Sequence, residues 1–225
     1  MRDPYINENG VLRNKLNITD YEELNKAEAD IGFLQLINID SIKMDDCDPK
    51  DAFKKLHKHI FKDIFDWAGE YRTCPLVKEE FIFPGYSVPY SPPRQIAKDL
   101  KKEILELELI DWTDLQPEER SMVFARRIAL LWKVHPFRDG NTRTTLSYAC
   151  VFAKEHGFPM DMRTFTDNLQ RLYYEDGMVR RHNIRDKFVL ASLEEENYPE
   201  VGPLASIFTR AMHNYKEPSG GSFHK

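Results

Sequence analysis

The chain of 225 residues is poor in cysteine, has no long apolar run and carries no surplus of basic charge. Its three cysteines, Cys47, Cys74 and Cys150, form no CxxC pair, which argues against a disulfide framework or a zinc knuckle. No apolar run approaches the roughly 20 residues that span a bilayer, and the N-terminus lacks the apolar stretch of a signal peptide. We therefore expect a reduced, cytoplasmic protein that contacts no membrane. Secretion into a host cell as an effector, by a machine that needs no N-terminal signal, stays open.

The charge balance is slightly acidic, with 32 Lys and Arg against 37 Asp and Glu and a net charge of −5. A general nucleic-acid-binding protein needs a basic surface, so we expect no direct contact with nucleic acid. Hydrophobic residues make up 41% of the chain, which is enough to form a core and excludes a disordered protein. The length fits one domain with at most an appendage.

Most of the chain has apolar residues at helical spacing. A capping box of Thr19 and Glu22 precedes the first predicted helix, whose inward face we expect to carry Leu24, Ala27, Ile31 and Leu34. Further helices are predicted after Asp48 and over about 96–107, 117–134, 141–156, 162–175, 178–196 and 203–215.

The segment from Leu76 to Tyr90 differs, because short β-prone runs alternate there with proline and glycine, which predicts a hairpin or flap. The expected fold is all-α with a small β-hairpin flap. We divide it into an N-terminal helical extension packed on the core (1–47), a main domain (48–215) and a flexible tail (216–225).

The most informative stretch reads His135-Pro136-Phe137-Arg138-Asp139-Gly140-Asn141-Thr142-Arg143. Pro136 disfavours the helical conformation at the preceding residue, so His135 stands at a junction between helix and loop. Gly140 permits a tight turn and a close approach of a ligand to the backbone. The helix that begins next presents unpaired N–H groups and the positive end of its dipole, which together form an anion site.

Three side chains of this stretch suit phosphoryl-type transfer. Arg143 in the first helical turn opposes the helix dipole, which makes sense if an anion lies between the two. Asp139 offers the oxygen ligand that a phosphate-bound Mg²⁺ takes. His135 has an ordinary pKa of about 6.5, suitable for removing a proton from an incoming hydroxyl.

Each of these residues also has a purely structural interpretation. A single histidine between helices is more often structural than catalytic, and Asp139 would serve equally well as an N-cap. Phe137 is expected to be an anchor in the core. The set as a whole favours the functional interpretation, because the structural one requires four coincidences within nine residues.

The stretch 135–143 resembles the signature of the Fic family, which reads His-x-Phe-x-Asp/Glu-Gly-Asn-x-Arg. The segment Asp66-Trp67-Ala68-Gly69-Glu70-Tyr71-Arg72 is similar to the one that precedes the flap in this family, and residues 11–16 resemble its N-terminus. The matches cover most of residues 5–215. The resemblance implies a mostly helical Fic-type bundle and a bacterial protein adenylyltransferase. Such an enzyme moves AMP from ATP to a Ser, Thr or Tyr hydroxyl of a target protein and releases pyrophosphate.

The resemblance also implies a role for each position of the signature. His135 would be the catalytic residue that deprotonates the target hydroxyl, and Asp139 would hold the Mg²⁺ that bridges the α- and β-phosphates. The side chain of Asn141 would also touch phosphate. The nucleotide- and phosphate-binding residues would be Gly140, Asn141, Thr142 and Arg143.

The flap would dock an extended segment of the target protein by strand addition, through Val77, Lys78, Glu79, Phe81 and Phe83. Trp67 and Arg72 are expected to brace the base of the flap. ATP and a target protein are the implied partners. The sequence leaves open whether a small inhibitor or antitoxin protein is another.

Two positions depart from the family pattern. Thr142 stands where the fuller pattern has glycine, and Leu146 stands where AMP-transferring members have a second arginine. In the family that arginine contacts the γ-phosphate and pairs with an inhibitory glutamate. Its absence leaves open a replacement cation elsewhere, another nucleotidyl donor, a Doc-like kinase, or a catalytically silent interaction module. The inhibitory signature, Ser/Thr-x-x-x-Glu-Gly/Asn, has one literal match, from Ser192 to Asn197 with Glu196 as the acid. We interpret it as a solvated helix end, and self-inhibition through Glu196 is the alternative.

Overall fold

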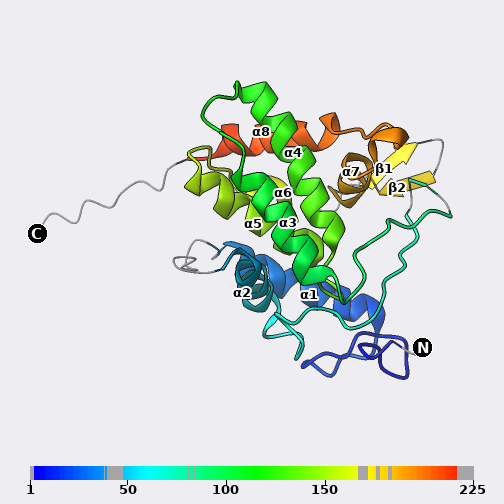
Figure 1. Ribbon diagram of the computed structural model, residues 1–225. Coiled ribbons are helices and arrows are strands. Elements are labelled where there is room, and N and C mark those ends of the chain that lie inside the picture. Colours follow the sequence, from blue (N-terminus) through cyan, green and yellow to red (C-terminus); the bar gives the residue numbers. More distant parts are fainter. Residues whose placement is uncertain are drawn as a thin grey trace, which may run out of the picture.

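The computed structural model describes residues 3–37, 39, 48–80, 82–83, 85–166, 172–175, 178–181 and 184–216. In these residues the fold is a helical bundle with one small antiparallel sheet (Figure 1). Its elements are α1 (Tyr21–Ile37), α2 (Pro49–Phe61), α3 (Ile96–Glu108), α4 (Pro117–Val134), α5 (Asn141–Glu155), α6 (Arg163–Thr166), β1 (Leu172–Glu175), β2 (Met178–Arg181), α7 (Ile184–Ala191), the 3₁₀ helix Glu195–Asn197, and α8 (Gly202–Asn214). The prediction of a mostly helical fold is confirmed.

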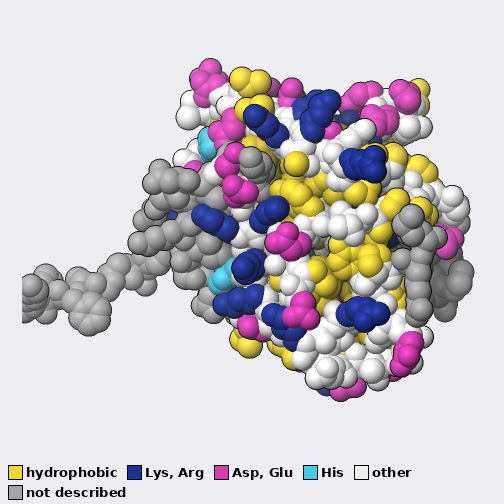
Figure 2. All heavy atoms as spheres, turned by 60° about the horizontal axis from the view of Figure 1, so that its bottom comes forward, with side chains coloured by type: hydrophobic (Ala, Val, Ile, Leu, Met, Phe, Trp, Pro, Cys, Tyr) yellow, Lys and Arg dark blue, Asp and Glu magenta, His cyan; other side chains and the backbone are white. Residues whose placement is uncertain are grey.

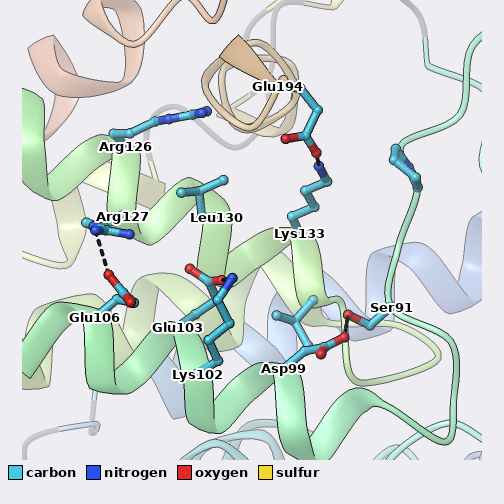
Figure 3. Close-up of a pocket in the computed structure, with 12 residues that line it drawn as sticks. Ser91, Asp99, Lys102, Glu103, Glu106, Arg126, Arg127, Leu130, Lys133 and Glu194 are labelled. Atoms are coloured by element: carbon cyan, nitrogen blue, oxygen red, sulfur yellow. Dashed lines mark hydrogen bonds and ion pairs between the residues drawn. The ribbon is translucent and has the colours of Figure 1, made fainter. Parts of the chain in front are cut away.

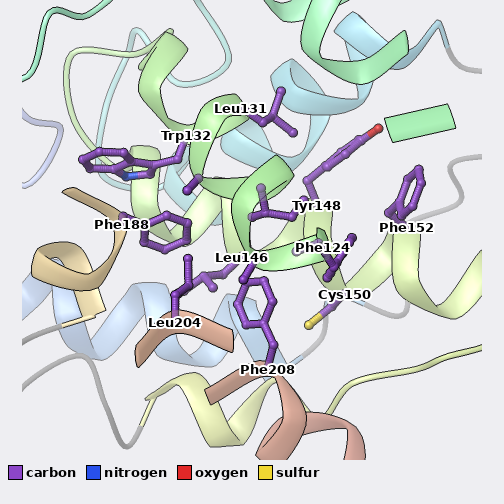
Figure 4. Packing of buried hydrophobic residues seen from close by; sticks show 14 of the residues in the cluster. Phe124, Leu131, Trp132, Leu146, Tyr148, Cys150, Phe152, Phe188, Leu204 and Phe208 are labelled. Carbon is purple, nitrogen blue, oxygen red and sulfur yellow. The ribbon is translucent and has the colours of Figure 1, made fainter. Parts of the chain in front are cut away.

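Helix α4 is the centre of the bundle, since α3, α5, α7 and α8 all pack against it (Figure 1). A proline at its first position begins it, as the fixed φ of proline favours. The face that the sequence predicts to be buried is buried, with Phe124, Ile128 and Leu131 fully enclosed. The main core forms around this face. Figure 4 shows its interior, where Leu146 of α5 lies among aromatic and aliphatic side chains.

A second, smaller cluster of buried apolar side chains joins α1 and the chain before it to α2. Leu24 of α1 and Phe61 of α2 belong to it. The prediction for α1 is wrong in two details. Leu34 is exposed, because buried Leu36 takes the inward place. The side chain that accepts a hydrogen bond at the helix start is Asp20, from the N–H of Glu23, rather than Thr19.

The predicted helices over 162–175 and 178–196 are wrong in part. Strands β1 and β2 pair antiparallel, with Leu172 opposite Arg181, and only 184–191 of the second range is α-helical. In the sequence, Asp176-Gly177 separates two runs that contain aromatic or β-branched residues, which is a hairpin signal that outweighs helical spacing.

The predicted β-hairpin flap is not shown as a strand pair. In the described part of 76–90, the only bridge joins Glu80 and Phe83. The Glu80 N–H donates to the carbonyl of Tyr86 at 3.1 Å, so the segment folds back as an irregular loop. Prolines in this segment remove donors that a ladder would need. We call 76–90 the flap loop; Phe81 and Pro84 lie outside the described residues.

Acidic and basic side chains are interspersed on the face that Figure 2 brings forward, around a central apolar area. That face therefore carries no extended field of one sign. No helix among the described residues has the length and apolarity to cross a bilayer. The division into 1–47, 48–215 and 216–225 stays a prediction.

Leu146 is only 1% exposed, so replacing it with alanine should leave a cavity in the main core. We expect Leu146→Ala to lower the free energy of unfolding by about 2–5 kcal/mol, measured by urea denaturation. The matched control is Leu105→Ala on α3, where the side chain is 50% exposed and the loss should stay below about 1 kcal/mol. Equal losses in the two variants would contradict this placement of Leu146.

Candidate active site

The loop from His135 to Gly140 joins the end of α4 to the start of α5. His135 ends α4 in the left-handed conformation, with φ 51° and ψ 60°, which is uncommon for a residue with a side chain. Arg72 holds this turn from outside, because its Nε donates to the His135 carbonyl at 2.8 Å and its backbone N–H donates to the Pro136 carbonyl at 2.9 Å. The same guanidinium bonds the carbonyls of Cys74 and Ser91. Arg72 thus ties Cys74 and Ser91, which flank the flap loop, to the turn that carries His135.

The imidazole of His135 is 1% exposed, and neither ring nitrogen has a hydrogen-bond partner. The ring stacks on Tyr90, with centroids 4.0 Å apart, and meets the edge of Trp132. Burial lowers the pKa of His135 well below its ordinary value, and the nearby cations Lys78 and Arg185 lower it further. The ring is therefore neutral at neutral pH. A buried polar group without a partner is rare, and here it lines a hollow of about 310 Å³.

The start of α5 forms another wall of this hollow. The first helical bond runs from the Thr144 N–H to the Gly140 carbonyl, so the N–H groups of residues 141–143 precede the hydrogen-bonded ladder. No side chain caps them. Gly140 has φ +76°, and a Cβ there would lie 2.3 Å from the Phe61 ring, so both the turn and the packing require glycine.

Asn141 and Thr142 fix the loop through their side chains. The Asn141 amide accepts from the Phe137 N–H at 2.9 Å and donates to the Phe137 carbonyl at 2.8 Å, which closes the loop on itself. The Thr142 hydroxyl accepts from the Trp132 indole at 3.1 Å. The predicted contact of the Asn141 side chain with phosphate stays a prediction; the contacts described here are structural.

Asp139 lines the same hollow, and one of its carboxylate oxygens accepts from the Gly140 N–H at 2.6 Å. Burial alone would raise the pKa of this carboxyl, but Lys78 and Arg143 outweigh burial and hold it below the ordinary value. The group is therefore charged. No cluster of three or more His, Cys, Asp or Glu that could hold a metal occurs among the described residues. One charged carboxylate is what Mg²⁺ uses when phosphates and waters complete its octahedron, so Asp139 fits that ion.

Three cations line the hollow, namely Lys78, Arg143 and Arg185. Arg143 pairs with the buried carboxylate of Glu28 on α1. Arg185 on α7 makes two bonds to Glu80 of the flap loop, at 2.6 and 3.2 Å. No ion pair between described residues includes Lys78. The hollow therefore brings together cations from three separate parts of the chain, beside the carboxylates of Glu79, Glu80, Asp139 and Asp186.

The site contains residues that sequence reasoning missed. His57 of α2 stacks on Phe137 with centroids 3.8 Å apart, bonds the carbonyl of Asp139 at 3.1 Å, and accepts from the Gly69 N–H at 2.9 Å. Burial lowers the pKa of His57 to about 3, so its ring is neutral and supports the loop structurally. A polar residue on an apolar helix face was the available signal for both His57 and Glu28. No sequence pattern pointed to Arg185.

The structure places the predicted docking residues in two settings. Lys78 and Glu79 line the hollow, whereas Val77 is 84% exposed and Phe83 also lies at the surface. Phe81 lies outside the described residues. Docking of a target segment by these residues stays a prediction.

A second hollow, of about 490 Å³, lies between α3, α4 and the end of the flap loop (Figure 3). Its charged side chains already have partners: Arg127 bonds Glu106 at 2.9 Å, Lys133 pairs with Glu194, and Asp99 accepts from the Ser91 hydroxyl at 2.6 Å. It lacks the buried unpartnered imidazole that marks the hollow beside α5.

Comparison with known proteins finds one family. The Fic/DOC family model matches residues 47–153. The chain is 30% identical over 160 residues to the protein adenylyltransferase VbhT of Bartonella schoenbuchensis, a match that covers 71% of this chain and 32% of that protein. It is 29% identical over 177 residues to a probable protein adenylyltransferase of Sinorhizobium fredii, covering 76% of this chain and 82% of the relative. The chain thus spans about a third of the length of the Bartonella relative.

Solved structures share the fold. The N-terminal Fic domain of a putative cell filamentation protein from Bartonella quintana, a VirB-translocated effector with bound ADP, has a TM-score of 0.68. The identity is 21%, and the match covers 92% of this chain and 93% of that one. The BepC effector of Bartonella tribocorum with bound AMPPNP has a TM-score of 0.64 at 20% identity, over 92% and 95% of the two chains.

Gly140→Ala tests whether the loop needs glycine for packing as well as for its turn. Alanine at φ +76° should cost about 1–2 kcal/mol of stability, and contact with the Phe61 ring should cost about 1–3 kcal/mol more. Gly157→Ala is the matched control, because Gly157 has φ +82° and a Cβ there would meet no atom within 4 Å. Urea denaturation should show the larger loss for Gly140→Ala, and equal losses would contradict the tight packing on Phe61.

Proposed function

Because residues 47–153 belong to the Fic/DOC family, we propose that this chain is a protein adenylyltransferase that moves AMP from ATP to a hydroxyl of a target protein. The observation that carries the proposal is the buried His135 imidazole with two unpartnered nitrogens, in one hollow with the uncapped start of α5. Relatives named protein adenylyltransferases support it. So do Fic-domain structures that hold ADP and AMPPNP.

His135 acts as the general base in this proposal. The target hydroxyl gives its proton to a ring nitrogen of the neutral imidazole while its oxygen attacks the α-phosphorus of ATP. A bond forms between that oxygen and the α-phosphorus, and the bond from the α-phosphorus to the bridging oxygen breaks. AMP is then attached to the target, pyrophosphate leaves, and His135 holds the proton until water takes it.

The start of α5 binds the phosphates in this proposal. Uncapped N–H groups and the positive end of the helix dipole favour an anion there, and they need no rearrangement to receive it. Gly140, Asn141 and Thr142 present this backbone, and Arg143 adds its charge in the first turn. Asp139 would hold Mg²⁺, which supplies charge neutralisation for the phosphates.

The target protein would approach over the flap loop. Val77 and Phe83 present apolar side chains at the surface, which suits an extended segment that lies along the loop. Glu196 of the literal inhibitory match is exposed, and none of the residues that line the hollow comes from 192–197.

Two alternatives follow from Leu146. Its burial in the core means that α5 offers no second cation to the nucleotide, since the remaining basic residue of the helix is Lys154 in its last turn. A Doc-like kinase or a catalytically silent interaction module would also tolerate such a site. The unpartnered imidazole favours the enzyme over the silent module, because a scaffold has no use for it.

Labelled ATP distinguishes these functions. Compared with a cell lysate alone, the lysate with the purified chain and Mg²⁺ should gain protein label from the α-phosphate of ATP and no additional label from the γ-phosphate. His135→Ala should lower this transfer by about 10²–10⁴-fold, since it removes the general base. Mass spectrometry of the labelled band identifies the modified residue.

The matched control is His213→Ala, which removes an exposed histidine of α8 and should leave transfer unchanged. Transfer of γ-label alone would replace the proposal with a kinase. Absence of any transfer by the folded wild-type chain would favour the interaction module.

A further inference from the structure

The three cations of the hollow differ in how firmly their side chains are already held. Phosphate chains carry several negative charges, so a site for them needs cations whose bonding capacity is free. The contacts of Arg143, Arg185 and Lys78 therefore decide which of them can meet a phosphate.

Arg143 is held by the N-terminal part of the chain. Its Nη2 bonds the carboxylate of Glu28, its Nη1 lies 3.3 Å from the Glu28 carbonyl, and the guanidinium lies over the Phe61 ring at 4.6 Å. Gly32 leaves room for it, because a Cβ there would come within 3.0 Å of Nη1. One edge of Arg143 is thus committed to α1.

Arg185 is held more completely. It bonds both carboxylate oxygens of Glu80, and its Nη2 also bonds the Tyr90 hydroxyl at 2.7 Å. Glu80 is only 2% exposed, and the Tyr90 hydroxyl donates to it at 3.1 Å. Drawing Arg185 towards a ligand would leave a buried carboxylate without its charge partner, which is costly. Arg185 therefore fixes the flap loop rather than serving as a mobile ligand.

Lys78 is the cation that remains free among the described residues lining the hollow. Its backbone N–H donates to the Ser87 hydroxyl at 3.1 Å, which fixes where the side chain starts. Exposure alternates along this part of the flap loop, since Val77 and Glu79 are exposed while Lys78 is partly enclosed and Glu80 is buried. In extended chain this alternation places Lys78 on the same inward side as Glu80.

The position of Lys78 also agrees with the electrostatics of the site. Burial lowers the pKa of Lys78, which means that an ammonium there gains from a nearby anion. Lys78 lines the same hollow as His135 and Asp139, where the proposed function places the phosphates.

We propose that Lys78 binds the phosphate chain of the donor nucleotide. The inference rests on the proposed function and deepens it, since it assigns to the loop a part in donor binding besides target docking. The aliphatic stem of lysine is flexible, so the ammonium can move to bind a phosphate. The two arginines cannot, because carboxylates hold them.

The test measures nucleotide binding to the purified full chain without any target protein, by isothermal titration with ATP, ADP and adenosine in Mg²⁺. Lys78→Met should weaken ATP and ADP binding by about tenfold or more, as loss of a charge-assisted bond to phosphate predicts. Adenosine binding should change less than about threefold, because it has no phosphate. Lys78→Arg should restore most of the affinity.

Lys98→Met is the matched control, because it removes the same charge from an exposed position on α3 and should leave all three affinities unchanged. Unchanged ATP affinity in Lys78→Met, beside normal binding by the wild-type chain, would overturn this inference and leave the proposed function standing. An equal loss for adenosine would overturn it too, since that pattern indicates damage to the pocket. Failure of the wild-type chain to bind ATP would overturn both.

Discussion

The site depends on the hydrogen bonds that Arg72 donates to the turn after α4. A histidine with φ 51° does not hold that conformation by preference, and three carbonyl acceptors around one buried guanidinium fix it there. His57 also supports this loop, because it stacks on Phe137 and bonds the Asp139 carbonyl. The imidazole of His135 is thereby presented to the hollow with its nitrogens free, and the helix start lies beside it. Neither the buried imidazole nor the helix start would indicate an active site by itself, since uncapped helix starts and buried histidines are both common in proteins.

Charge in the hollow is balanced by carboxylates that lie outside the family signature. Glu28 from α1 anchors Arg143, and Glu80 from the flap loop anchors Arg185. These pairs connect the N-terminal helix and the flap loop to the same small volume. The residues matched by the family model begin at position 47, so Glu28 lies before them. The segment that the sequence presents as an extension thus contributes a contact to the site.

The sequence predicted the features that local rules control. Apolar spacing located α3, α4 and α5, and proline and glycine located the turn between the last two. The nine-residue signature identified most of the residues that line the hollow. The signature did not predict the ion pairs of the site, because these pairs join segments that are far apart in the sequence. The pairing of Glu28 with Arg143 spans 115 positions, and that of Glu80 with Arg185 spans 105. Leu146, which stands where the family has a second arginine, is part of the core in the structure. Between β1 and β2 the sequence reads Asp-Gly, a local hairpin signal that competes with the helical spacing of the same range.

The protonation of His135 tests the central claim most directly. Histidine-labelled protein can be titrated by NMR without nucleotide, with His135→Gln to assign the resonance. Burial with two cations nearby predicts a pKa well below the ordinary value of about 6.5, so the ring should stay neutral as the pH falls through that value. An imidazole that protonates at pH 6.5 or above would be solvated or paired with a carboxylate. It would then not be the enclosed, unpartnered base on which the proposed chemistry rests.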